Sequence, residues 1–365
     1  MKAVILAGGY ATRLRPLSFA KPKLLFPIAG KPMLERTLDT LGKGGVDSVI
    51  LAVNYMADEL KAHFGSRYRN IMIRYSREHQ PLGTGGPIKL AQKLIGSKST
   101  FLAMNGDILF QEDLSMMLER HKREKAIVTI ALHEVVDASR FGLVKTDDKM
   151  RVSSFVEKPS KQGSVKGLIN AGIYLMSPAI FDYIQSYRKV SIEREVFPIL
   201  AREGRLLGYE LKGYWKDIGT IKDYLEANFS FLKMESPRKP IVARGAKISR
   251  NAILRPPCMV LKKATIEEKS IIGPFTVIGE GSIIEKCATV RRSVLFNNVH
   301  IGRSSVVSNS IIGDKSRLSR GVRLMEGTVL GAEVSVGAAL KLKGGVNVCP
   351  YKEVAEDVSG PANIL

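Results

Sequence analysis

The sequence predicts an α/β domain with a Rossmann-like, doubly wound mixed sheet in residues 1–232, followed by a parallel β-helix of hexapeptide repeats in residues 240–365. Three observations predict this architecture. Strand and helix signals alternate in the first part, aliphatic residues recur every six positions in the second, and the stretch MESPRKP lies between the two. A chain of 365 residues is also longer than one ordinary core requires.

The first predicted strand, AVILA at residues 3–7, is a short apolar run that ends at two glycines, as buried strands often do. The helix expected at residues 31–45 has Pro32 in its first turn and two glycines at its end. Strands that alternate with helices predict a mainly parallel sheet with ligands at the carboxyl ends of its strands. Further strands are expected at 46–55, 70–76 and 100–104, and further helices at 56–65 and 83–96.

Beyond residue 240, aliphatic side chains form two six-residue series, Val242 to Val290 and Val306 to Val348, with a register shift near residues 296–306. This period matches neither a helix face nor the alternation of a flat strand. It fits a coil in which each short face points one aliphatic side chain inward, so a parallel β-helix is favoured over a β-sandwich. Glycines expected at tight corners are Gly273, Gly279, Gly302, Gly313 and Gly331.

The composition limits the possible partners and locations. The net charge of +21 favours anionic partners, but the charges are scattered and form no basic tail. We therefore expect a polyanionic small substrate rather than nucleic acid. No apolar run approaches a membrane span, and the run before Gly8 is too short for a signal peptide, so we expect a cytoplasmic protein without membrane contact. The three widely spaced cysteines predict no disulfide framework.

The stretch VILAGGYATRLRPL at residues 4–17 places a glycine turn after the first strand, then Arg13 and Arg15, with Lys23 downstream. It contains neither the GxGxxG of a dinucleotide site nor the GK[ST] of a P-loop. Glycine backbone N–H groups can approach phosphates, and a guanidinium beside a flexible ammonium suits a triphosphate. The alternative is a plain strand-to-helix turn with solvated charges.

Eight motifs between residues 6 and 220 then resemble, in order, those of the sugar-phosphate nucleotidylyltransferases, and the likeness continues into the hexapeptide repeats. They are LAGGYATRLRPLSFAKPKLLFPIAGKPM, EHQPLGTGGP, NGD, FGLV, FVEKP, INAGIYL, SIEREVFPILA and GYWKDIGT. Together with the hexapeptide repeats, the chain is most similar to the GDP-mannose pyrophosphorylase branch. Two positions depart from the family pattern: Ala11 stands where glycine is usual, and Leu24 where proline is usual. A methyl group at residue 11 requires ordinary backbone angles or strain.

The resemblance implies a nucleotidyltransferase fold with a left-handed β-helix, and guanylyl transfer from GTP to mannose 1-phosphate. The sugar-phosphate oxygen would attack the α-phosphorus in line and release pyrophosphate, with Mg²⁺ as cofactor. A homo-oligomer to which the β-helix contributes is also expected. One alternative is a uridylyl-, thymidylyl- or adenylyltransferase acting on another sugar 1-phosphate. A second is a non-enzymatic regulatory paralogue or translation-initiation exchange-factor subunit, but such proteins tend to lose the charged site residues that this chain retains.

The expected catalytic residues are Arg13, Lys23, Asp107 and Asp217, and the two aspartates are also the expected Mg²⁺ ligands. Each aspartate follows a strand-like run, so both can face one crevice and share a cation with substrate phosphates. The expected nucleotide-binding residues are Leu6, Ala7, Gly8, Gly9, Thr12, Arg13, Lys23, Glu78, Gly83, Thr84, Asn105 and Asp107. The expected sugar-phosphate-binding residues are Gly142, Glu157, Lys158, Asn170 and Trp215.

The base preference is expected to depend on Glu78, five residues before Gly83, where family members that take thymine or uracil have Gln. A carboxylate only accepts hydrogen bonds. The N1–H and N2–H₂ groups of guanine form a donor pair that it can accept, whereas uracil offers one N–H between two carbonyls. Glu78 therefore predicts guanine. Gln80, two residues further on, is the alternative base-reading residue.

Overall fold

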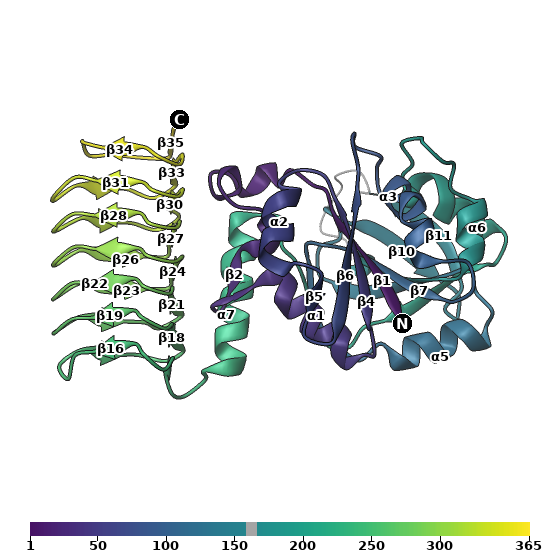
Figure 1. The fold of residues 1–365 in the computed structure, drawn as a ribbon, viewed down its shortest axis with the longest axis horizontal. Helices are drawn as coiled ribbons and strands as arrows, with labels where there is room; N and C mark the ends of the chain where they lie inside the picture. Colours follow the sequence, from purple (N-terminus) through teal and green to yellow (C-terminus); the bar gives the residue numbers. More distant parts are fainter. Residues whose placement is uncertain (158–165) are drawn as a thin grey trace. The chain divides into compact units, whose positions relative to one another are not determined.

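The computed structural model describes residues 1–157 and 166–365, which form two compact units (Figure 1). The sheet unit comprises residues 1–10 and 34–217, and the β-helix unit comprises residues 11–33 and 218–365. The segment 11–33, which precedes most of the α/β elements in the sequence, therefore packs with the β-helix. The sequence domains 1–232 and 240–365 remain a prediction.

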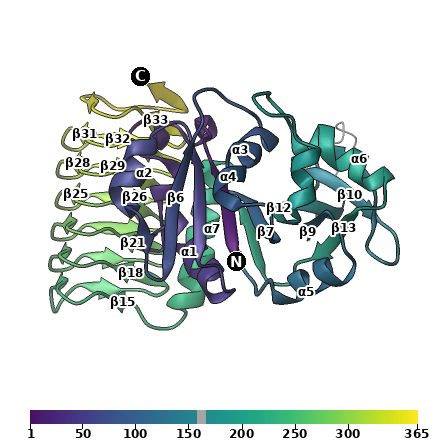
Figure 2. The ribbon, with the colours of Figure 1, turned by 45° about the vertical axis from the view of Figure 1, so that its right-hand side comes forward.

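The sheet unit contains a mixed sheet with the strand order β11-β10-β12-β7-β1-β4-β6-β5, and β9 pairs with both β12 and β13 (Figure 2). The first strands predicted from the sequence form its parallel part, because β1 lies between β4 and β7, and β4 pairs with β6. β12 runs antiparallel to β7 and β9, which makes the sheet mixed, as predicted. The strands are β1 (Lys2–Ala7), β4 (Ser48–Val53), β5 (Arg67–Tyr68), β6 (Ile71–Arg77), β7 (Phe101–Asn105), β9 (Val128–Val135), β10 (Gly142–Thr146), β11 (Val152–Glu157), β12 (Gly167–Met176) and β13 (Leu206–Glu210).

A separate ribbon of β8 (Ile108–Gln111) and β14 (Tyr214–Asp217) joins two distant parts of the chain, and two short strands, β2 (Pro27–Ile28) and β3 (Lys31–Pro32), pair with each other. Pro32 thus precedes the first helix instead of lying in its first turn as expected. The helix expected at residues 83–96 is interrupted at Ala91, whose ψ of −5° departs from helical geometry. The helices are α1 (Met33–Lys43), α2 (Ala57–Phe64), α3 (Gly85–Leu90), α4 (Gln92–Ile95), α5 (Ser115–Arg123), α6 (Phe197–Arg202) and α7 (Ile221–Glu235). Shorter helical turns are Thr12–Leu14, Leu17–Phe19, Lys23–Leu25, Pro178–Asp182 and Ile192–Val196.

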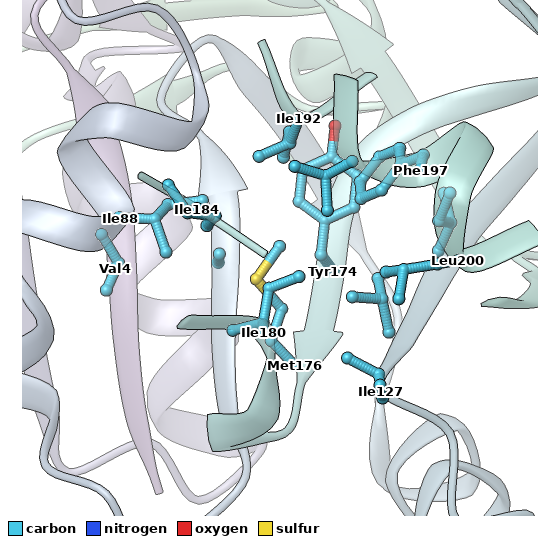
Figure 3. Packing of buried hydrophobic residues seen from close by; sticks show 14 of the residues in the cluster. Val4, Ile88, Ile127, Tyr174, Met176, Ile180, Ile184, Ile192, Phe197 and Leu200 are labelled. Carbon is cyan, nitrogen blue, oxygen red and sulfur yellow. The ribbon is translucent and has the colours of Figure 1, made fainter. Parts of the chain in front are cut away.

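The core of the sheet unit lies against β12 (Figure 3). Tyr174 on this strand is fully buried, and its ring centroid lies 5.3 Å from that of Phe197 on α6. Phe101 on β7 stacks on Phe181 at 5.5 Å. This packing gives β12 a rigid support, which matters because Asn170 lies on the same strand.

The β-helix consists of three stacked parallel sheets, as the six-residue period predicts (Figure 1). The first sheet contains β15 (Ile241–Val242), β18 (Cys258–Val260), β21 (Thr276–Ile278), β24 (Val294–Leu295), β27 (Ile311–Ile312), β30 (Val329–Leu330), β33 (Val346–Val348) and β35 (Ala362–Ile364). The second contains β16 (Lys247–Ile248), β19 (Thr265–Ile266), β22 (Ile283–Ile284), β25 (His300–Ile301), β28 (Arg317–Leu318), β31 (Ser335–Val336) and β34 (Glu353–Val354). The third contains β17 (Ile253–Leu254), β20 (Ile271–Ile272), β23 (Thr289–Arg291), β26 (Val306–Ser308), β29 (Arg323–Leu324) and β32 (Lys341–Leu342).

The predicted phase shift in the repeat has a structural cause. Val290 pairs with Val307, a separation of 17 residues, whereas Ile272 pairs with Val290, a separation of 18. Val307 is fully buried and Val306 only half-buried, so the prediction that Val306 points inward is wrong by one residue. The prediction for Val242 is also wrong, because it is 42% exposed in the first strand of its stack.

The glycines expected at corners are needed mainly for close approach between coils. A Cβ on Gly279 would lie 2.0 Å from the carbonyl oxygen of Phe296 in the next coil. Of the five named corners, Gly273 alone combines such an approach with a positive φ, of 95°. Several left-handed turn positions instead carry other residues, such as Lys263 and Lys315, both at φ 58°.

The junction before the β-helix is ordered by specific contacts. Helix α7 continues through Glu235, so the first two residues of MESPRKP are helical. The buried Ser236 hydroxyl donates to the carbonyl oxygens of Lys239 and Cys258 at 2.6 and 3.1 Å. The predicted linker is thus fastened to the second strand of the first sheet of the β-helix.

Candidate functional site

The carboxyl ends of β1 and β7 bring several predicted nucleotide-binding residues together. Leu6 on β1 pairs with Asn105 on β7, and the Gly106 N–H donates to the Leu6 carbonyl oxygen at 2.9 Å. Ala7 is the last residue of β1, and the Gly8–Gly9 turn follows it. The parallel ladder therefore sets the glycine turn beside the turn that carries Asp107.

The two aspartates predicted to share a cation lie at the same end of two paired strands, β8 and β14. Asp107 directly precedes β8, and the antiparallel register of β8 and β14 places Asp217 opposite Ile108, the residue next to Asp107. Both aspartates are half-buried. Residues 110 positions apart in the sequence are therefore brought to the same end of the β8–β14 ribbon.

Asn105 and Asn170 are connected through Gly172. A Cβ on Gly172, which has φ 72°, would lie 2.8 Å from the side-chain nitrogen of Asn105. Asn170 accepts a hydrogen bond from the Gly172 N–H and donates one to the Tyr174 hydroxyl, both at 2.9 Å. The pairing of β12 with β9 shifts register between Asn170 and Tyr174, so the Asn170 amide stabilises an irregular backbone. That amide retains one N–H and one lone pair for another partner.

Trp215 supports this irregularity from β14. Its indole N–H donates to the Ala171 carbonyl oxygen at 2.8 Å, and its ring lies 5.7 Å from that of Phe141. The side chain is 9% exposed. Trp215 thus connects the strand that carries Asp217 to the backbone beside Asn170 as a packed residue, and its predicted contact with the sugar stays a prediction.

Glu78 lies directly against the glycine turn. A Cβ on Gly8 would come within 3.0 Å of Glu78 Oε1, while Oε2 accepts the Leu82 N–H at 3.1 Å. The side chain is only 6% exposed, and this burial raises the pKa of the Glu78 carboxyl, although the Leu82 hydrogen bond opposes the shift. Gln80, the alternative base-reading residue, is exposed. A buried carboxylate beside a glycine turn is a directed hydrogen-bond acceptor.

Gly83 and Thr84 fasten their loop to a distant segment. A Cβ on Gly83, at φ 77°, would lie 2.4 Å from the Val190 carbonyl oxygen. The Thr84 hydroxyl donates to Glu193 at 2.6 Å and accepts from the Ile192 N–H at 3.0 Å. The side chain of Thr84 therefore orders the loop, and Glu193, in the motif SIEREVFPILA, is a functional candidate that the sequence analysis missed.

Four of the five predicted sugar-binding residues lie on strands of the sheet unit, β10, β11, β12 and β14, and their contact with a sugar stays a prediction. Gly142 on β10 pairs with Glu157 on β11, so their backbones are adjacent. Phe141, next to Gly142, contacts Trp215 and so connects this edge to β14. Lys158 lies outside the described residues.

The predicted cations belong to the β-helix unit. Thr12 and Arg13 are exposed in a short helical turn, and Lys23 is half-buried in another. Ala11, which precedes the first turn, adopts φ 49° and ψ 41° in the left-handed region. The departure from the family glycine is thus accommodated by strain at Ala11 and not by ordinary backbone angles.

The two aspartates fit a hard divalent cation. Carboxylate oxygens are the ligands that Mg²⁺ prefers, and Mg²⁺ commonly takes one or two of them together with water and substrate phosphates. Within residues 1–157 and 166–365, no group of three or more His, Cys, Asp or Glu side chains could hold a metal ion. An ion at Asp107 and Asp217 would therefore depend on the substrate for part of its coordination.

The class of the protein follows from comparison with known families. A family profile described as "Nucleotidyl transferase" matches residues 2–233, and one described as "GMPPB C-terminal domain" matches residues 242–364. The chain belongs to the nucleotidyl transferase family. Its full length aligns with all of "Mannose-1-phosphate guanylyltransferase 1" of Arabidopsis thaliana and of "Mannose-1-phosphate guanyltransferase beta-B" of Xenopus laevis, each at 37% identity.

Solved structures are similar to about three-fifths of the chain. The crystal structure of HddC from Yersinia pseudotuberculosis is 34% identical with a TM-score of 0.55, covering 63% of this chain and 99% of that one. A putative glucose-1-phosphate thymidylyltransferase from Bacillus anthracis is 24% identical with a TM-score of 0.57, covering 62% of this chain and 94% of that one, and shows the fold alone. In the described part of the chain, no helix is both long and apolar enough to span a membrane.

Proposed function

We propose that this protein transfers a guanylyl group from GTP to mannose 1-phosphate, giving GDP-mannose and pyrophosphate. The backbone register that sets Asp217 opposite Ile108, the residue after Asp107, supports it most directly. Asp107 follows the carboxyl end of β7, the edge at which a parallel sheet receives ligands. The full-length relatives that carry the name mannose-1-phosphate guanylyltransferase support the choice of substrates.

The chain supplies positioning and charge to this reaction. The phosphate oxygen of mannose 1-phosphate attacks the α-phosphorus of GTP, and the bond to the leaving pyrophosphate breaks, so no protein nucleophile is required. Arg13 and Lys23 hold the triphosphate and the departing pyrophosphate. The glycine turn at residues 8–9 lets backbone N–H groups approach the phosphates.

A divalent cation, Mg²⁺ in our proposal, would be held by Asp107 and Asp217. When bound, it would neutralise the charge that grows on the phosphate oxygens. The β1–β7 pairing holds the glycine turn in place, and the β8–β14 pairing holds the two aspartates in register. The carboxylates would therefore fix the position of the cation relative to the glycine turn.

Base recognition is assigned to Glu78. Its carboxylate accepts the guanine N1–H and N2–H₂ donors, and its burial makes a mismatched acceptor or donor costly. The crystal structure of HddC from Yersinia pseudotuberculosis complexed with GMP-PN, at 33% identity and a TM-score of 0.53, supports a guanine nucleotide.

The sugar contacts are assigned to Gly142, Glu157, Lys158, Asn170 and Trp215, as the family resemblance implies. The assignment of Asn170 has the strongest support. Gly172 and Tyr174 use only half of the hydrogen-bonding capacity of its amide, and the other half is left for a sugar hydroxyl. A cytoplasmic location and a homo-oligomer remain predictions.

The decisive experiment measures pyrophosphate release with Mg²⁺ from each of four nucleoside triphosphates, with mannose 1-phosphate and glucose 1-phosphate as acceptors. We expect GTP with mannose 1-phosphate to give the highest kcat/KM. A higher value with UTP would contradict the role of Glu78, and an equal value with glucose 1-phosphate would contradict the assigned sugar.

A further inference from the structure

Lys21, two residues before the predicted catalytic Lys23, reaches into the β-helix. Its ammonium lies 2.6 Å from Asp314 Oδ2 and 5.3 Å from the centroid of the Phe296 ring. Both partners lie on the first sheet side of adjacent coils, because Phe296 follows β24 and Asp314 lies two residues after β27. Both members of the ion pair are about four-fifths buried, with exposed fractions of 23% and 21%. Such a pair is less screened than a surface pair.

Asp314 is itself held in place by the coil. Its Oδ1 accepts the Asn297 N–H at 3.0 Å, and its carbonyl oxygen accepts the Glu333 N–H at 2.8 Å. The carboxylate therefore presents Oδ2 to Lys21 from a fixed position.

The far end of the same segment is fastened as well. The Phe26 ring lies 5.7 Å from Phe296 and 5.6 Å from Tyr224 on α7, both in edge-on geometry. The Tyr224 hydroxyl donates to the Pro27 carbonyl oxygen at 2.5 Å, and Asn228 on α7 accepts the Ala29 N–H at 2.8 Å.

Lys23 lies between these two anchors. The helical turn that contains it is closed by the Phe26 N–H, which donates to the Lys23 carbonyl oxygen at 2.9 Å. With Lys21 fixed on one side and Phe26 on the other, the backbone of Lys23 has little freedom.

We propose that the β-helix takes part in catalysis, with Asp314 acting through Lys21 as a positioning residue for Lys23. This inference rests on the proposed function, in which Lys23 holds the triphosphate and the leaving pyrophosphate. Asp314 fixes the segment and also neutralises the ammonium of Lys21, which would otherwise repel that of Lys23 or compete with it for phosphate. Phe296 also helps to hold Lys21, because the face of its ring attracts the same ammonium.

The test compares Asp314→Asn, Lys21→Met and the double variant with the wild type. We expect each single variant to raise the KM for GTP, and the KM for pyrophosphate in the reverse reaction, by about tenfold. Lys23, which holds both groups in the proposed function, would lose its fixed position. The KM for mannose 1-phosphate should stay unchanged. The double variant should be no worse than either single one, since all three break the same interaction.

Glu333→Gln is the matched control. It breaks the 3.0 Å ion pair between Glu333 and Lys315, the residue that follows Asp314 in the sequence. Neither member of this pair belongs to the segment 11–33. The control should keep wild-type kinetics. Equal changes in the control and in Asp314→Asn, or additive losses in the double variant, would overturn the proposal.

Hydrogen exchange provides a readout that does not depend on activity. Asp314→Asn should speed exchange of the amides of residues 17–28 and leave the coils on either side protected. Unchanged exchange there overturns the positioning role. If the wild type fails to form GDP-mannose while exchange changes as expected, the assigned reaction fails and the anchoring of the segment stands.

Discussion

The two units of this protein carry candidate site residues of opposite charge, carboxylates in the sheet unit and cations in the β-helix unit. The sheet unit supplies acceptors at its strand ends, the carboxylates of Glu78, Asp107 and Asp217, held by local β-ladder register. The β-helix unit supplies the cations Arg13 and Lys23, on a segment whose position depends on contacts with residues more than 190 positions away, such as Tyr224 with Pro27. Ladder register holds the acidic groups, whereas the cations lie on a segment that packs with the β-helix.

The largest expected effect belongs to the acceptors. Asp217→Asn should lower kcat by about 10²- to 10³-fold, because an amide is a much weaker ligand for a hard cation than a carboxylate. Steady-state assays across a Mg²⁺ titration measure this loss, and circular dichroism checks that the fold is retained.

Asp113→Asn is the control, because Asp113 follows the other end of β8 and caps the turn into α5 through Ser115 at 2.9 Å. It should keep its activity. Normal turnover in Asp217→Asn would show that the two aspartates do not form the metal site, and the sheet unit would then not supply the carboxylates that catalysis needs.

The cation side should respond next. Lys23→Met should lower kcat/KM for GTP by about 10²-fold, since one fixed charge on the leaving pyrophosphate is lost. Lys23→Arg should recover part of the activity, and Lys43→Met, an exposed change on α1, should have no effect. A Lys23→Met enzyme with wild-type kcat/KM would mean that Lys23 has no part in phosphate binding.

Base selection is expected to give a smaller change. Glu78→Gln should reduce the preference for GTP over UTP by about tenfold, because an amide places a donor where guanine also presents donors. Competition between the two nucleotides at equal concentration measures the ratio, and Gln80→Ala, at the exposed neighbour, is the matched control. A preference that moves only in Gln80→Ala would transfer the role to that residue.

The pH dependence tests the same residue. Glu78 can accept from both guanine donors only when it is ionised, because a protonated carboxyl presents an O–H donor at one oxygen, and burial raises the pKa of this carboxyl. The KM for GTP should therefore rise as the pH falls through this raised pKa. The rise should begin at a higher pH than it would for a glutamate with an ordinary pKa. In Glu78→Gln this rise should be absent, and its persistence would assign the titration to another group.

The smallest effect concerns the strained residue at the start of the segment. Ala11→Gly should stabilise the protein by about 0.5 kcal/mol, because relief of the left-handed strain outweighs the added entropy of glycine in the unfolded chain. Ala62→Gly, in helix α2, should instead destabilise it by about 1 kcal/mol. Denaturant unfolding measures both, and destabilisation by both substitutions would show that Ala11 is not strained.

Much of this molecule can be predicted from residue patterns, because the patterns reflect local geometry. Apolar runs that end in glycine or in NGD mark strands whose ends carry function, and the spacing of aliphatic residues identifies the β-helix. The errors there are equally local: the buried residues Val307 and Ile312 are five rather than six residues apart, so counting back six from Ile312 gives Val306 instead of Val307. The sequence locates the register shift only approximately, whereas the strand pairing shows two successive coils of 17 residues, Val277 to Val294 and Val294 to Ile311.

The grouping of residues 11–33 with the β-helix could not be predicted in this way. Lys21 and Asp314 are ordinary charged residues in the sequence, and their ion pair exists only because the chain brings positions 293 residues apart into contact. The supporting roles of Glu193, Gly172 and Trp215 likewise arise from packing between distant strands and loops. Residue types and spacing specify which chemistry the chain carries, because they act over a few residues. Three-dimensional packing sets which body holds each group, because that depends on contacts between surfaces that no short stretch encodes.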